Sequence, residues 1–143
     1  MRVLFVCMAN SCRSQMAEGW ARRLWPSDWE AHSAGLVTYP ITAATREAMA
    51  EAGVDLAGQE SKPIDLFWLG DFDLVVTLSE EAARFLPPLD DPTRHRHHPV
   101  DDPMAVRGEP AEIRAEFRRA RDTIREIVAA LAPPTGAPPD PVS

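Results

Sequence analysis

Cys7, Arg13 and Ser14 form a Cys-x5-Arg-Ser pattern near the start of the chain. These three residue types can together carry out nucleophilic chemistry on an anion. A cysteine thiolate is a strong nucleophile, and a nearby guanidinium and helix N-terminus favour the thiolate over the thiol. The planar Arg13 side chain can hold two oxygens of an anion, and the Ser14 hydroxyl can donate a hydrogen bond to the sulfur. We therefore predict that Cys7, Arg13 and Ser14 are catalytic.

The backbone between Cys7 and Arg13 is predicted to bind a tetrahedral oxyanion. Its amide groups precede a helix, where no carbonyl inside the helix accepts their hydrogen bonds, and the helix dipole adds partial positive charge. Asn10 tolerates the left-handed backbone that a curled loop needs. The predicted anion-binding residues are consecutive: Met8, Ala9, Asn10, Ser11, Cys12 and Arg13. A buried cysteine before an ordinary surface loop is the alternative that the bare pattern leaves open.

Two elements must position this loop. Val3–Val6 is a short run of strand formers, long enough for a buried parallel strand. After the loop, apolar residues at four-residue spacing predict one face of a helix, made of Met16, Trp20 and Leu24. Ligands of parallel sheets bind beyond the carboxyl ends of the strands, and Cys7 follows the first such end.

The rest of the chain alternates strand and helix signals. Further strands are predicted over 29–33, 73–77 and 95–100, and helices over 42–52, from Ser79, and from Pro110 to Leu131. This alternation is typical of the α/β class, so we expect a three-layer fold with a four-stranded, mostly parallel sheet and helices on both faces. We expect one domain over residues 1–131, followed by a disordered proline-rich tail over 132–143.

Composition narrows the function classes. The 143 residues include 15 basic and 22 acidic side chains, for a net charge of -7, which argues against nucleic-acid binding. No apolar run approaches the ~18 residues that span a bilayer, and the N-terminus does not resemble a secretory signal. We expect a cytoplasmic protein without a membrane partner. The two cysteines, Cys7 and Cys12, are too few and too close for a disulfide framework.

The loop and its surroundings also resemble a known family. Residues 6–18 are similar to the signature of the low-molecular-weight protein tyrosine phosphatase superfamily, and residues 10–20 most resemble its arsenate reductase branch. Further matches follow in the family order: Ser33-Ala34-Gly35, Gly53-Val54-Asp55, Val75-Val76-Thr77-Leu78, Asp102-Pro103 and Phe117-Arg118-Arg119-Ala120-Arg121. The resemblance implies an enzyme that converts arsenate to arsenite through a Cys7 adduct, as part of arsenic detoxification.

The family resemblance also implies a general acid at Asp102. A carboxylic acid there can protonate the leaving oxygen while the thiolate attacks, and Pro103 excludes the helical conformation at the preceding residue. An Asp-Pro pair that only forms a turn is the alternative. Asp101 is the second candidate for the acid.

The source of electrons separates a reductase from a phosphatase. Reductases of the thioredoxin-linked type carry two relay cysteines, but this chain has Ser79 and Leu86 at the matching positions. We therefore expect no bound cofactor and an external low-molecular-weight thiol that attacks the Cys7–arsenate adduct and carries the arsenic away, with glutaredoxin or thioredoxin as partner. The first alternative is a phosphatase that hydrolyses phosphomonoesters, although Met104 and Ala105 stand where family phosphatases usually carry tyrosine. A noncatalytic oxyanion-binding module is the minor alternative.

Several other residues have two interpretations. Cys12 is either a possible redox partner of Cys7 or a small buried side chain under the loop. The resemblance implies that Ser33 hydrogen-bonds Asn10 and supports the loop. Lys62 is expected to be a solvated surface lysine rather than a built-in cation near the site. The histidines at 95, 97 and 98 are expected on a solvated strand or loop, and we expect no metal site.

Overall fold

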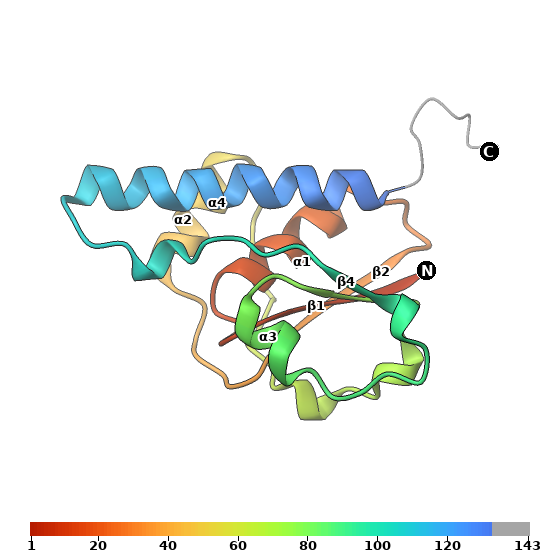
Figure 1. Ribbon diagram of the computed structural model, residues 1–143. Helices are drawn as coiled ribbons and strands as arrows, with labels where there is room; N and C mark the ends of the chain where they lie inside the picture. The colour runs from red at the N-terminus through yellow and green to blue at the C-terminus, as the bar shows by residue number, and fades with distance from the viewer. Residues whose placement is uncertain (133–143) are drawn as a thin grey trace.

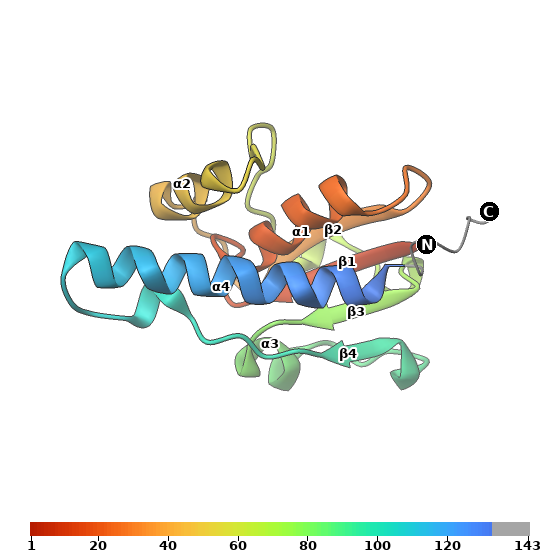
Figure 2. The same ribbon diagram turned by 90° about the horizontal axis from the view of Figure 1, so that it is seen from above.

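The computed structural model describes residues 1–132 and contains one sheet of four strands. The strands are β1 (Arg2–Cys7), β2 (Glu30–Gly35), β3 (Leu74–Thr77) and β4 (His95–His97). Their order is β2-β1-β3-β4, and every neighbouring pair is parallel. Figure 2 shows β1 in the interior of the sheet. The predicted sheet is thus confirmed, and the carboxyl end of β1 lies among the ends of its neighbours, where the sequence places the reactive loop.

Helices cover both faces of the sheet, as predicted. Figure 1 shows α1 (Arg13–Leu24), α2 (Ala43–Glu51) and α4 (Pro110–Leu131) on one side and α3 (Glu80–Phe85) on the other. The alternation of side chains along β1 explains both cores. Val3, Phe5 and Cys7 pack toward α1 and α4, whereas Leu4 and Val6 join the smaller core under α3.

Two predicted strands differ from those observed by more than one residue at an end. The second strand runs to Gly35 rather than Ser33, because β1 continues to pair with it as far as Cys7. The fourth strand ends at His97 instead of reaching Val100, since Pro99 has no amide hydrogen to donate to a ladder. The amides of His98 and Val100 still donate to β3 and the residue after it, Thr77 and Leu78, so the chain stays extended toward the site.

The last helix ends at Leu131, the residue to which the sequence pattern predicts it to run. Residues 133–143 of the predicted tail lie outside the described residues. Within residues 1–132, no helix combines the length and the hydrophobicity needed to cross a membrane.

Candidate active site

The loop between β1 and α1 turns its carbonyl groups outward. The carbonyl oxygens of residues 7–12 all accept hydrogen bonds, from the amides of Leu36, Val37, Tyr39, Thr42 and Met16 and from the side chains of Ser61 and Gln15. Among the described residues, the amides of residues 8–13 have no acceptor, although Asn10 to Arg13 are buried. Buried amides without partners are rare in proteins. The backbone of this loop is therefore a cradle of free donors, which suits a tetrahedral anion.

Asn10 gives the loop its curl. Its φ angle is 52°, in the left-handed region, as expected from the sequence. The orientation of its side-chain amide is set by the backbone N–H of Lys62, which donates to Oδ1 at 2.8 Å. Nδ2 therefore faces Ser14, to whose Oγ it donates at 2.7 Å. Gln15 adds a second bond to Oδ1 at 2.9 Å.

The same chain of hydrogen bonds ends at the sulfur of Cys7. Ser14 Oγ lies 2.9 Å from Cys7 Sγ. Because the hydroxyl already accepts a bond from Asn10, its own hydrogen is free to point at the sulfur. Both side chains are buried, at 3% exposure for Cys7 and none for Ser14. The Ser14 hydroxyl is therefore placed to donate a hydrogen bond to the Cys7 sulfur.

Arg13 and Asp102 meet at the mouth of the loop. Nη1 of Arg13 donates to the carbonyl of Val100 at 2.8 Å, and Nη2 lies 3.7 Å from Oδ2 of Asp102. The other carboxylate oxygen of Asp102 accepts from the amide of Met104, so the residue does form the turn that was its alternative interpretation. Its side chain remains 39% exposed and lies next to the guanidinium. The turn is thus observed and leaves the carboxylate beside Arg13, whereas the role of Asp102 as general acid stays a prediction.

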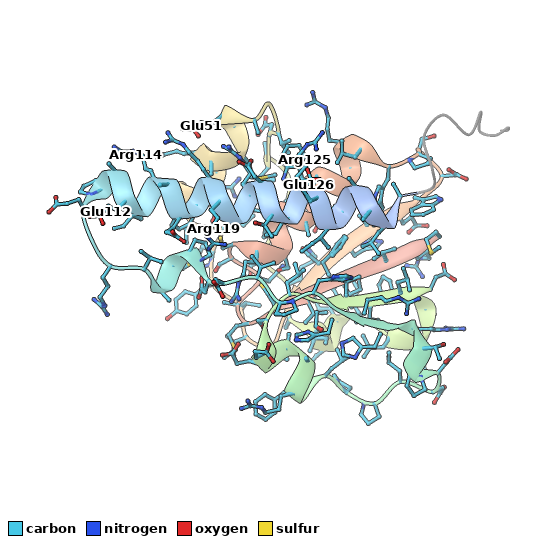
Figure 3. All side chains as sticks on the ribbon, turned by 45° about the horizontal axis from the view of Figure 1, so that its top comes forward. Glu51, Glu112, Arg114, Arg119, Arg125 and Glu126 are labelled. Atoms are coloured by element: carbon cyan, nitrogen blue, oxygen red, sulfur yellow. The ribbon has the colours of Figure 1, made fainter. Side chains whose placement is uncertain are left out.

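The last helix holds the segment that carries Asp102. Nη2 of Arg119 donates to the carbonyl of Asp101 at 3.2 Å, while its Nε donates to Glu116. Figure 3 shows Arg119 on the side of α4 that faces this segment. On the opposite side, Glu51 joins α2 to α4 through Arg118. The acid candidate is thus attached to a long helix rather than to a free loop.

Cys12 lies beneath the cradle with 2% of its surface exposed. Burial raises the pKa of its thiol to about 12, although a hydrogen bond with Thr45 opposes the shift. Cys12 is therefore a neutral thiol at physiological pH, a state that reacts slowly with disulfides and metals. Its position in the core under the loop favours packing over a redox role.

Ser33 does not hydrogen-bond Asn10, so that part of the expected loop support is wrong. Its hydroxyl donates to Oε1 of Glu18 at 2.5 Å instead. Glu18 is a buried carboxylate that also accepts from Arg22 at 2.6 Å and lies 3.6 Å from Nζ of Lys62. Lys62 is consequently a partner of a buried acid rather than a fully solvated surface residue. Ser33 supports the loop only indirectly, through Glu18 and Lys62.

Sequence reasoning missed two glutamines and the role of Glu18. Gln15 is fully buried and donates to Asn10, while Gln59 donates to Oε1 of Gln15 at 2.8 Å. The position of Gln15 directly after the predicted catalytic Ser14, in the first turn of the helix, was the available signal. Glu18 follows Ser14 by one helical turn, which places both on the side of α1 that faces the loop.

The histidine cluster is separate from the cradle. His95 Nε2 and His97 Nδ1 both lie 2.8 Å from the hydroxyl of Thr77, and His97 approaches Glu80 at 3.4 Å. No group of three or more side chains suited to bind a metal occurs in residues 1–132.

A cavity of about 350 Å³ opens over the loop and is lined by Met8, Arg13, Ser79, Glu80, Glu81, Pro99, Val100, Asp101, Asp102 and Ala105. A larger cavity of about 560 Å³ lies between residues 64–70 and 87–94 and contains none of the predicted site residues. Of these two cavities, the smaller is the one lined by residues of the loop, Met8 and Arg13, and by the acid candidate Asp102.

A family-wide sequence model described as low molecular weight phosphotyrosine protein phosphatase matches residues 2–136. The chain belongs to this family. The arsenate reductase of Bacillus subtilis is 40% identical to this chain over 122 residues, which is 85% of this chain and 88% of the relative. A solved arsenate reductase in the phosphate binding state is 32% identical, with a TM-score of 0.75 over 91% of this chain and 95% of the other.

A more distant solved structure shows only the shared fold. The tyrosine phosphatase AmsI of Erwinia amylovora is 19% identical, with a TM-score of 0.72 over 89% of this chain and 87% of the other. This chain therefore shares more sequence with the two arsenate reductases than with this phosphatase.

Proposed function

We propose that this protein is an arsenate reductase that uses the Cys7 thiolate as nucleophile and an external thiol as reductant. The observation that carries the proposal is the 40% identity to a named arsenate reductase over most of both chains, at a site whose free amides surround a cysteine. Arsenate is a tetrahedral oxyanion that fits such a cradle. The sites named from the sequence fit this role, with residues 8–13 holding the oxyanion.

In the first step, the Cys7 sulfur attacks arsenic and one arsenic–oxygen bond breaks. Asp102, beside Arg13, gives its proton to the departing oxygen, which leaves as water. The guanidinium and the loop amides neutralise the remaining oxygens. The product is a Cys7–arsenate thioester, with arsenic still in its oxidised state.

In the second step, an external thiol gives its proton to the Asp102 carboxylate and attacks arsenic. The sulfur of Cys7 leaves as a thiolate, which the Ser14 hydroxyl stabilises. A second thiol, from a glutaredoxin or thioredoxin, then attacks the sulfur of the released thiol–arsenic compound. A disulfide forms, the electron pair stays on arsenic, and arsenite leaves. Two thiols are oxidised to one disulfide for each arsenate reduced.

The second step is assigned to an external thiol because neither end of α3 carries a cysteine. Ser79 is the N-cap of this helix and accepts from the amide of Ala82, and Leu86 is its C-cap. These are the two positions where the resemblance expects relay cysteines. Cys12, neutral and packed in the core, is a poor substitute. We infer that the protein works in the reducing cytoplasm, where it serves arsenic resistance.

Phosphatase activity is the second candidate, because the same cradle and acid suit a phosphomonoester. Tyr39 favours it: its amide donates to the carbonyl of Ala9, and its ring is 66% exposed beside the loop. Against it, Met104 and Ala105 follow the acid in place of an aromatic wall. A side-by-side assay decides. Arsenate reduction with small-thiol, glutaredoxin and thioredoxin systems supports the reductase, whereas aryl phosphate hydrolysis without any arsenate reduction refutes it.

A further inference from the structure

The cavity beside the loop that carries Cys7 is lined by acidic side chains, which together form what we call its rim. Four of the ten residues that line it are carboxylates, and one is a cation. The carboxylates are Glu80, Glu81, Asp101 and Asp102, and the cation is Arg13. Met8 and Arg13 place the cavity next to Cys7, so a small reagent that approaches the loop through it passes these carboxylates. The rim is therefore able to select reagents by charge.

The neighbouring cations do not cancel this charge. Arg13 faces Asp102 at 3.7 Å and is the group that holds the oxyanion, so it is already engaged when the adduct exists. Arg119 pairs with Glu116 at 2.7 Å. His97 lies 3.4 Å from Glu80 and is charged only when protonated. Neither Arg119 nor His97 lines the cavity.

The acidic side chains of the rim are also carried by segments that are held in position. Glu80 and Glu81 occupy the first turn of α3, where the helix dipole favours negative charge, and Ser79 caps the same turn. Asp101 is held through its own carbonyl by Arg119, so its carboxylate is not used in that contact. None of the three is needed to hold the oxyanion in the cradle.

We propose that Glu80, Glu81 and Asp101 determine which thiol reduces the Cys7 adduct, and that they select an uncharged or cationic thiol over an anionic one. This inference rests on the proposed external thiol. Once arsenate is bound, the adduct adds negative charge below the rim, and an anionic thiol meets repulsion from both. Coulomb interactions of several carboxylates with the thiol through water, reduced by salt, predict a preference of about five- to thirtyfold at low ionic strength between thiols of charge +1 and -1.

The test compares three thiols of different charge on the whole protein. Cysteamine is cationic, 2-mercaptoethanol is neutral and 3-mercaptopropionate is anionic. Each rate constant of arsenate reduction is divided by the rate constant of the same thiol with hydroxyethyl disulfide, which removes intrinsic reactivity. A second measurement uses the mixed disulfide of Cys7 with 2-mercaptoethanol in the Cys12→Ser protein, so that exchange with a second cysteine of the chain is excluded. This exchange requires no arsenic chemistry.

The variants change the rim without changing the cradle. Glu80→Gln/Glu81→Gln removes two rim charges, and Asp28→Asn/Glu126→Gln removes two exposed charges elsewhere as the matched control. Asp101→Asn tests the rim separately, in case the double change unfolds α3. Thermal unfolding establishes that each variant is folded.

The rim variants are expected to react about two- to fivefold faster with 3-mercaptopropionate and no faster with cysteamine, while the control ranks the thiols as the wild-type protein does. The inference is overturned if the wild-type protein ranks the thiols as hydroxyethyl disulfide does, or if rim and control variants respond alike. If no thiol supports arsenate reduction while the mixed disulfide still shows the charge preference, the proposed function fails and the charge selection at Cys7 stands.

Discussion

Replacing Ser14 with alanine tests whether the Ser14 hydroxyl stabilises the reacting sulfur of Cys7. The bond is 2.9 Å long and both side chains are buried, so water cannot replace the lost donor. A hydrogen bond to a charged group contributes about 1.5–3 kcal/mol, which corresponds to a loss of about ten- to 150-fold in rate. The loss is expected in the formation of the adduct and again when Cys7 leaves as a thiolate.

The assay follows arsenate-dependent thiol oxidation by Ser14→Ala, together with the rate of Cys7 alkylation by iodoacetamide at neutral pH. Ser11→Ala is the matched control, because the Ser11 hydroxyl lies in the same loop but donates to Met104 and not to Cys7. We expect Ser14→Ala to lose turnover and alkylation together, and Ser11→Ala to keep its alkylation rate. A folded Ser14→Ala protein within about twofold of the wild type in both would refute this role of the hydroxyl.

Three further predictions address the acid, the second cysteine and the helix pair. Asp102→Asn should lower turnover by about a hundredfold or more without preventing oxyanion binding, measured by arsenate kinetics and phosphate inhibition; loss of binding with unchanged turnover of the bound form would contradict the acid role. Cys12→Ser should leave turnover and recovery from peroxide unaltered, and a slower recovery would instead assign Cys12 a redox function. The bond with Arg118 lowers the pKa of Glu51 to about 2, so this pair should add stability above the ordinary value of 4.5 and lose it as the pH falls toward 2. Thermal unfolding of Glu51→Gln should therefore differ from the wild type near neutral pH and converge with it in acid, and a constant difference would contradict the assignment.

The sheet and the loop could be predicted because their signals are local. A short apolar run, a polar loop and an amphipathic helix follow one another over residues 3–24, and each signal depends on neighbours in the sequence. The left-handed Asn10 and the bond from Ser14 to Cys7 followed from the same local pattern. The extent of β4 was harder to predict, because Pro99 ends the ladder while leaving the chain extended.

The supports of the loop could not be predicted because they come from distant segments. Ser33 was assigned to Asn10, but β2 places its hydroxyl beside Glu18 instead. Lys62 was interpreted as a surface residue, since no sequence pattern shows that a buried carboxylate lies 3.6 Å from its ammonium. Contacts of this kind depend on how α1 packs against β2, and that packing becomes visible only in three dimensions.

The central claim is that the sulfur of Cys7 attacks an oxyanion that the free amides of the loop hold. The most direct measurement is arsenate-dependent thiol oxidation by the Cys7→Ser protein, together with the binding of phosphate to the same protein. The serine keeps the size of the side chain and leaves the loop amides in place. We expect Cys7→Ser to bind phosphate and to lose turnover. A folded Cys7→Ser protein that keeps its turnover would contradict the role of the sulfur.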